Sequence, residues 1–246
     1  MEMSIERIFK SKNLLGNVHP AVIATWAALI AVGNLLPTMP IIATGGSFSV
    51  SVALIPLAGI LFGPVGGAIA AAIGGFVGQI IAPHTAWLGI ATFLVGTINA
   101  FAAGLVSRGK WIWVVLIIAV GTALWFATEI GRNAAIFPLV FYSLGVIMAV
   151  IGGTVGRKWL VKDKLLLKGL GIWFASFSGF VAAASIANFF GIIIIQIPAE
   201  VWRFLVFISP WERAFFALGA AIIGVPLLVS LPKIGMHVGP ATWKNN

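Results

Sequence analysis

Long apolar segments follow one another along the whole chain and are separated by short polar stretches. They run at about 18–36, 48–62, 64–82, 88–107, 111–128, 134–156, 169–195 and 212–231. Most are close to the roughly 20 apolar residues that a helix needs to cross a bilayer. The pattern predicts an all-α polytopic bundle of about eight transmembrane helices. We expect one integral domain over residues 1–246, located in the cell membrane.

The second and third apolar segments are divided only by Gly63 and Pro64. A proline inside a helix lacks the amide hydrogen and clashes with the preceding turn. A single helix over 48–82 would also be longer than one bilayer crossing requires. We therefore expect two short helices that are joined by a tight turn.

The segment 197–211 has the pattern of a short amphipathic helix. Val201, Phe204, Leu205 and Ile208 recur at positions i, i+3, i+4 and i+7, which places them on one helix face. Two tryptophans lie close by in the sequence. The pattern predicts an interfacial helix that lies on the outer membrane surface.

Composition supports the membrane assignment and excludes several kinds of chemistry. Hydrophobic residues make up 61% of the chain and charged residues 9%, whereas a soluble domain has about 25% charged residues. The chain has no cysteine, which excludes disulfides, thiolate nucleophiles and cysteine metal sites. Asp163 is the single aspartate beside five glutamates, so a carboxylate-rich metal centre lacks ligands. We expect neither a metal site nor a cofactor.

The basic residues are divided unequally between the two predicted sides of the membrane. If the N-terminal segment 1–17 is cytoplasmic, three of the 15 Lys and Arg residues, namely Arg132, Arg203 and Arg213, fall in outer segments, and the other twelve fall in inner ones. Cytoplasmic loops carry an excess of positive charge, so we expect both chain ends in the cytoplasm. The net charge of +9 is then an orientation signal, and we expect no nucleic-acid partner.

Small residues spaced four apart are frequent in the first half of the chain. Glycine and alanine pairs repeat over 59–78, and the first apolar segment holds the pairs Ala24–Ala28 and Ala27–Ala31. This spacing lets helix backbones approach closely. The close approach can be made within the chain or against a partner helix.

The stretch from Ile55 to Gly75 combines the Gly63-Pro64 turn with a Gly/Ala-rich helix. It resembles the substrate-binding S components of energy-coupling factor transporters, and the segments 93–108 and 212–233 are similar to later helices of that family. The resemblance implies a subunit that captures a small vitamin-like solute or another micronutrient outside the cell. It also implies a transmembrane coupling subunit, and ATPase subunits that hydrolyse the ATP.

The resemblance further implies how this subunit would meet its partners. The alanine pairs of the first segment, Ala24, Ala27, Ala28 and Ala31, match the motif by which S components dock on the coupling subunit. The uncharged loop 37–47 corresponds to a loop that closes over the ligand in that family. The family usually has six spans rather than eight, so two segments here are either additions or incomplete crossings. Substrate residues differ between S components, and none is transferred by motif.

Polar side chains inside apolar segments are energetically costly and often functional. On the favoured topology most lie toward the outer half, where a pocket needs apolar walls and a few fixed hydrogen-bonding groups. The candidate solute-binding residues are Asn34, Gln79, His84, Trp87, Trp125, Glu129, Arg132 and Asn133. Structural roles compete with this interpretation. Tryptophans anchor at membrane interfaces, and Glu129 and Arg132 can form a local ion pair. The amides of Asn34 and Gln79 can hydrogen-bond to each other or to the backbone.

We expect a transport function rather than an enzyme. The sequence has no Gly-x-x-x-x-Gly-Lys-Ser/Thr phosphate loop, no Gly-x-Ser-x-Gly elbow and no His-Glu-x-x-His pair, which are the motifs of ATPases, serine hydrolases and zinc proteases. The alternatives are a structural membrane scaffold of the cell-wall elongation type and a stand-alone secondary transporter. The sequence does not identify the solute.

Overall fold

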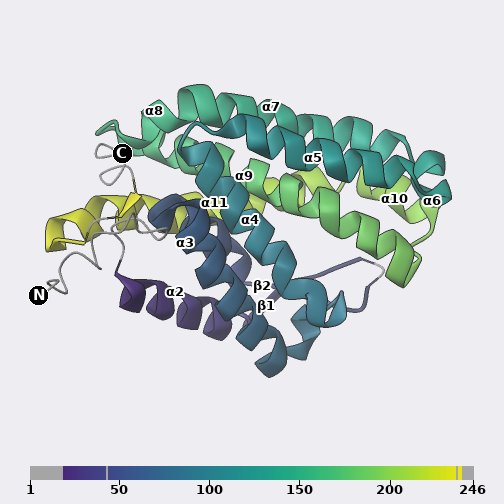
Figure 1. Cartoon of the computed structure of the whole chain (residues 1–246), viewed down its shortest axis with the longest axis horizontal. Helices are drawn as coiled ribbons and strands as arrows, with labels where there is room; N and C mark the ends of the chain where they lie inside the picture. Colours follow the sequence, from purple (N-terminus) through teal and green to yellow (C-terminus); the bar gives the residue numbers. More distant parts are fainter. Residues whose placement is uncertain (1–18, 43, 237, 240–246) are drawn as a thin grey trace, which may run out of the picture.

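The chain forms a bundle of helices and a single small hairpin of strands within the residues that the computed structural model describes, which are 19–42, 44–236 and 238–239 (Figure 1). The predicted cytoplasmic segment 1–17 lies outside these residues. The first described helix is α2 (Pro20–Gly33), and the hairpin of β1 (Pro37–Pro40) and β2 (Ser47–Ser49) connects it to α3 (Ser51–Ile81). β1 and β2 are antiparallel, with Pro37 opposite Ser49.

The chain reverses its direction inside α3. Gly63 has φ 85° and ψ 173°, a conformation that glycine adopts at no steric cost. Gly67 has no room for a side chain because its Cα lies against the backbone of Gly59. In a continuous helix these residues would be about 12 Å apart. The predicted tight turn at Gly63-Pro64 is therefore confirmed, and α3 consists of two antiparallel segments, 51–62 and 64–81.

The remaining helices follow in close succession. They are η1 (Pro83–Thr85), η2 (Gly89–Ala91), α4 (Thr92–Ser107), α5 (Trp111–Phe126), α6 (Glu129–Asn133), η3 (Pro138–Tyr142), α7 (Ser143–Ile151), η4 (Gly152–Gly156), α8 (Arg157–Leu160), α9 (Leu165–Phe190), η5 (Gly191–Ile195), α10 (Ala199–Leu205), α11 (Ser209–Ser230) and η6 (Leu231–Ile234). The elements from η3 to α8 form one helical stretch, in which η3 and η4 are π-helical.

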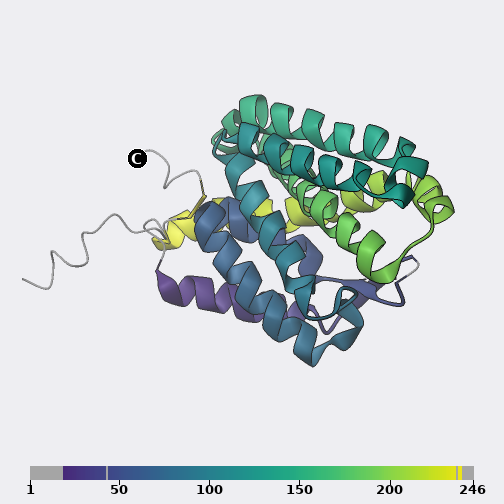
Figure 2. The ribbon, with the colours of Figure 1, turned by 45° about the vertical axis from the view of Figure 1, so that its right-hand side comes forward.

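The helix α9 is the central element of the bundle. It contacts α4, α5, α7 and α11, and Figures 1 and 2 show α5 and α7 on one side of it and α2, α3 and α4 on the other. Its buried residues include a run of small side chains over 182–185. Small side chains let neighbouring backbones approach closely, which explains why several helices pack around this one.

Five helical stretches are long and apolar enough to cross a membrane. They are Ser51–Ile81, Gly89–Ser107, Pro138–Leu160, Leu165–Ile195 and Ser209–Ile234. Large apolar side chains face outward on them and on α5, as Val120 (55% exposed) and Ile222 (66% exposed) illustrate. Such a surface suits lipid rather than water. The all-α membrane bundle is therefore confirmed, while the count of eight crossings stays a prediction.

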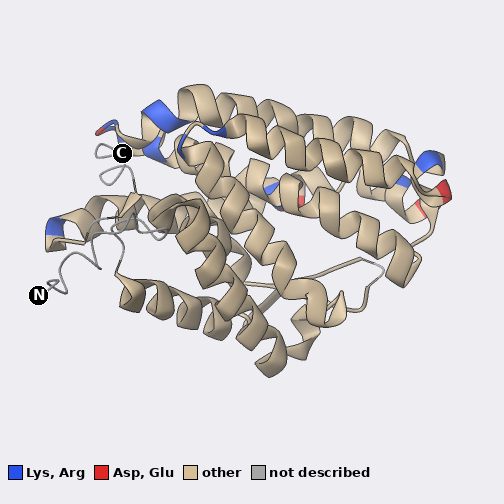
Figure 3. Cartoon of the chain, in the orientation of Figure 1, with Lys and Arg blue, Asp and Glu red and all other residues tan. Residues whose placement is uncertain are grey.

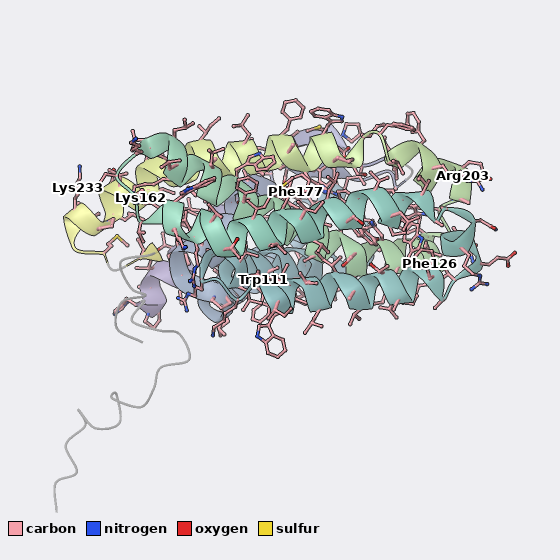
Figure 4. The ribbon with its side chains drawn as sticks, turned by 90° about the horizontal axis from the view of Figure 1, so that it is seen from above. Trp111, Phe126, Lys162, Phe177, Arg203 and Lys233 are labelled. Carbon is pink, nitrogen blue, oxygen red and sulfur yellow. The ribbon has the colours of Figure 1, made fainter. Side chains whose placement is uncertain are left out.

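Charged residues gather at the two ends of the bundle. Figure 3 shows Lys and Arg concentrated at one end, and Figure 4 places Lys162 and Lys233 there, with Arg203 at the opposite end. Gly63 lies against the Arg108 guanidinium, and Gly109 lies against that of Arg157. The turn after the first half of α3, the turn after α4 and the start of α8 therefore meet at the basic end.

The predicted amphipathic helix near residue 200 is present as α10, but its buried face differs from the prediction. Trp202, Leu205 and Val206 are buried, whereas Phe204 is exposed. The Trp202 indole donates a hydrogen bond to the Ile197 carbonyl. Because α10 packs its tryptophan into the bundle, contacts within the protein determine its buried face. Its position at the outer membrane surface stays a prediction.

Candidate binding cavity

A partly open cavity of about 160 Å³ lies among α3, α4, α9, α10 and α11, and the β1–β2 hairpin forms one of its walls. Aromatic and small apolar side chains make up most of the lining. The aromatic lining residues are Phe48, Trp87, Phe93, Phe137, Phe141, Phe180 and Trp202. Apolar walls with few polar groups are typical of small-molecule sites.

Asn34, a predicted site residue, lines the cavity and fixes the hairpin to α2. It is buried, and its Oδ1 accepts hydrogen bonds from Ser49 Oγ at 2.9 Å and from Ser51 Oγ at 2.6 Å. The two hydroxyls lie 2.7 Å apart. Because the protein already uses this carbonyl oxygen twice, the primary role of Asn34 is to position the wall.

Gln79, the second predicted amide, also lines the cavity and is satisfied by the backbone. Its Nε2 donates to the Ile90 carbonyl at 3.0 Å, and its Oε1 accepts from the Phe93 amide at 3.1 Å. Gln79 therefore ties the end of α3 to the start of α4. Sequence analysis allowed this backbone role as the competing interpretation.

Trp87 and His84 lie in the loop between α3 and α4, beside the hairpin (Figure 2). Trp87 is part of the cavity lining, whereas His84 is not. Gly46 packs against the Trp87 Cβ and the His84 carbonyl. His84 Nε2 is buried without a hydrogen-bond partner among the described residues. This loop supports the hairpin and contributes Trp87 to the cavity wall.

Trp125, Glu129, Arg132 and Asn133 do not line the cavity. Trp125 is fully buried, donates to the Gly131 carbonyl at 2.8 Å and stacks on Phe137 at 5.2 Å. It is a core residue here.

The other three candidates are exposed on or near α6. Arg132 donates to the carbonyls of Phe126 and Ala127, and no ion pair with Glu129 occurs among the described residues. The backbone carbonyl of Asn133 accepts from Arg203 at 2.8 Å. The predicted position of the site beside 129–133 is therefore corrected: the cavity lies instead beside α11.

Glu212 and Arg213 are the charged residues of the described cavity lining, and sequence analysis did not include them in the site. Arg213 Cζ lies 4.8 Å from the centre of the Phe48 ring, a cation–π contact. Arg213 Nε is buried and has no hydrogen-bond partner among the described residues. The sequence feature that could have indicated this part of the site is a pair of adjacent charges at the start of an apolar segment. The predicted topology places these charges in an outer flanking segment.

Asn99 is a third polar residue that sequence analysis missed. It lines the cavity from α4 and is 4% exposed. Its Oδ1 accepts no hydrogen bond from the described part of the chain. Asn188, also in the lining, donates to the Tyr142 hydroxyl at 3.2 Å. The polar groups without a protein partner are therefore contributed by Asn99 and Arg213.

The described residues contain no group of three or more His, Cys, Asp or Glu side chains that could hold a metal ion. The cavity can bind a solute through one carboxylate, one guanidinium and amide groups, between aromatic walls.

Comparisons with known proteins assign no family to the chain. No family model matches it, and no solved structure matches it. The chain is similar to "Uncharacterized protein MJ0923" of Methanocaldococcus jannaschii, with 26% identity over 184 residues. The match covers 72% of this chain and 61% of that protein, so the chain spans less than two thirds of its relative's length.

Proposed function

We propose that this protein is a membrane-embedded solute-capture subunit similar to the S components of energy-coupling factor transporters. It binds a small vitamin-like or other micronutrient solute, and partner subunits hydrolyse the ATP. The observation that carries the proposal is the cavity itself, which combines aromatic walls, buried unpaired polar groups and a hairpin wall held by Asn34.

The proposal includes eight crossings of the cell membrane with both chain ends in the cytoplasm. Counting α3 as two segments, the helices that would cross are α2, 51–62, 64–81, α4, α5, the stretch 138–160, α9 and α11. The start of α2 and the end of α11 lie at the same end of the bundle as the basic cluster (Figures 1 and 3). Positive charge favours the cytoplasmic side.

The proposed coupling surface includes two of the four alanines that the sequence pattern predicted. Ala27 and Ala31 are buried, and the backbone of Ala27 lies directly against Gly74 of α3. Their role is packing within the chain. Ala24 and Ala28 are exposed on the outer face of α2, so they are the members of the set that can meet a transmembrane coupling subunit.

Native mass spectrometry of the full chain, purified in detergent, tests the capture function. We expect a co-purified small molecule at one copy per chain, and its loss when Phe180 on the cavity wall is replaced by tryptophan, because the larger ring fills the space. Ile222→Trp, on the exposed face of α11, is the matched control. A structural scaffold would retain no small molecule, and that result would contradict the proposal.

A further inference from the structure

We infer that the captured solute is amphoteric: it carries an anionic group that pairs with Arg213 and a protonated amine or N–H donor that pairs with Glu212. The inference rests on the proposed function, namely that this cavity captures a solute. It names the chemical class of that solute from the two charged side chains that line the cavity.

The first step concerns the two charges. Glu212 and Arg213 are adjacent on α11 and both line the cavity. Side chains at i and i+1 point about 100° apart on a helix and do not face each other. No ion pair joins them in the described structure, so each has a side that is free for a ligand.

The second step concerns charge balance. The described lining contains one carboxylate and one guanidinium. The two charges are close enough to attract each other, so a simple anion beside the guanidinium would be repelled by the carboxylate, and a simple cation beside the carboxylate would be repelled by the guanidinium. A solute with both charges satisfies both groups, so it is favoured over either ion.

The third step concerns the hydrogen-bonding groups. Asn34 and Gln79 already use their carbonyl oxygens within the protein. Asn99 also lines the cavity, but its Oδ1 is inaccessible and packs against Gly179 of α9, so it offers no acceptor to a solute. On the anionic side, the guanidinium fork of Arg213 matches a carboxylate or phosphate.

The fourth step concerns size. The cavity measures about 160 Å³, close to the ~150 Å³ cavity that accepts one benzene ring in another protein. The aromatic walls, with Phe48 stacked below the Arg213 guanidinium, suit an apolar body of that size. The solute class is thus a small amphoteric molecule whose apolar body is no larger than about one six-membered ring.

The test is a binding panel with three charge classes. The purified full chain is screened by isothermal calorimetry and affinity mass spectrometry against the twenty standard amino acids, the matching deaminated acids and the matching decarboxylated amines. Molecules that co-purify with the chain are identified in parallel. We expect the ligand, from the panel or from co-purification, to be amphoteric, and its matched acid and amine to bind at least about 10-fold more weakly.

Variants locate the binding groups. Arg213→Gln and Glu212→Gln should each weaken binding of the amphoteric ligand by about 10- to 100-fold. Arg213→Lys keeps the charge but loses the planar fork, so it should retain part of the affinity. The matched controls are Arg203→Gln and Glu200→Gln on α10, both exposed and outside the lining. They should keep wild-type affinity. Gel filtration of each variant verifies folding.

The outcomes separate the two proposals. An amphoteric ligand that loses affinity in both α11 variants supports the inference. A ligand that is purely anionic, purely cationic or neutral overturns the inference but leaves solute capture standing, as does wild-type affinity in well-folded Glu212→Gln and Arg213→Gln variants. If no panel member binds and nothing co-purifies, the proposed function itself fails.

Discussion

At the scale of single residues, the same chemical group has different roles in different surroundings. The amides of Asn34 and Asn99 both lie buried at the cavity. The oxygen of Asn34 accepts two serine hydroxyls, whereas that of Asn99 accepts nothing from the described chain. The first residue therefore holds the hairpin wall, whereas the oxygen of the second packs against Gly179 of α9.

Replacement of Asn34 by alanine should loosen the hairpin. The change leaves Ser49 and Ser51 without their shared acceptor in a buried position, at about 1–3 kcal/mol. We expect a lower melting temperature in detergent and faster proteolysis near Gly45 and Gly46. Asn133→Ala, at an exposed position, is the control. An unchanged melting temperature for Asn34→Ala would show that the serine pair does not hold the hairpin.

At the scale of elements, local chemistry was predictable and long-range packing was not. The turn inside α3 follows from Gly63 and Pro64 together, because proline weakens the helix and glycine adopts the positive φ that the turn needs. Pro56 and Pro226 stand inside helices without such a turn. The buried face of α10 depends instead on Trp202 meeting Trp125 at 4.9 Å and Phe137 at 5.3 Å. Those partners lie more than sixty positions away in the sequence, and no local pattern indicates them.

The candidate site likewise combines residues that local sequence predicts with residues that only long-range packing brings in. Asn34, Gln79 and Trp87 were predicted and do line the cavity. Glu212 and Arg213 were missed because their position inside the wall depends on the hairpin packing against α11, where Phe48 meets Arg213 and also Phe216 at 5.0 Å. The sequence locates polar residues within apolar segments, but the folded packing decides which of them share a cavity.

The two antiparallel segments of α3 approach so closely that Gly67 cannot be replaced by a larger residue. Gly67→Ala places a Cβ against the backbone of Gly59, which cannot move aside as a flexible side chain would. We expect the yield of monodisperse protein to fall sharply and the melting temperature of the remainder to drop. Gly169→Ala is the control, since its Cβ would meet only Val225 at an ordinary 3.6 Å. Equal stability of the two variants would contradict the close packing.

The two faces of α2 give a prediction about coupling. Ala28→Trp adds a bulky ring on the exposed face, so it should block assembly with a coupling subunit while solute binding and folding are preserved. Ala27→Trp should unfold the protein, because Ala27 is 3% exposed and backs onto Gly74. Co-purification with the coupling subunit measures assembly. Normal assembly of Ala28→Trp would remove this face from the coupling surface.

At the scale of the whole molecule, the charge distribution gives the bundle a direction. The basic end gathers Arg108, Arg157 and Lys162, while the opposite end carries Arg203. Burial lowers the pKa of the Arg108 guanidinium, but an arginine side chain stays charged at physiological pH. The basic end therefore keeps its orientation signal, and we expect this end to lie in the cytoplasm.

The chain has no cysteine, so single cysteines can test this direction. We expect Glu200→Cys, on exposed α10, to react with a membrane-impermeant maleimide in intact cells. Lys162→Cys, at the opposite end of the bundle, should react only after permeabilisation. Both positions lie outside the helices that would cross the membrane, so both cysteines are in water and their reactivity reports sidedness rather than depth. The reverse labelling pattern would invert the bundle and expose the basic end outside. Labelling of both positions in intact cells would mean that the two ends of the bundle lie on the same side of the membrane. That result would overturn the proposal that the bundle spans the membrane along its long axis.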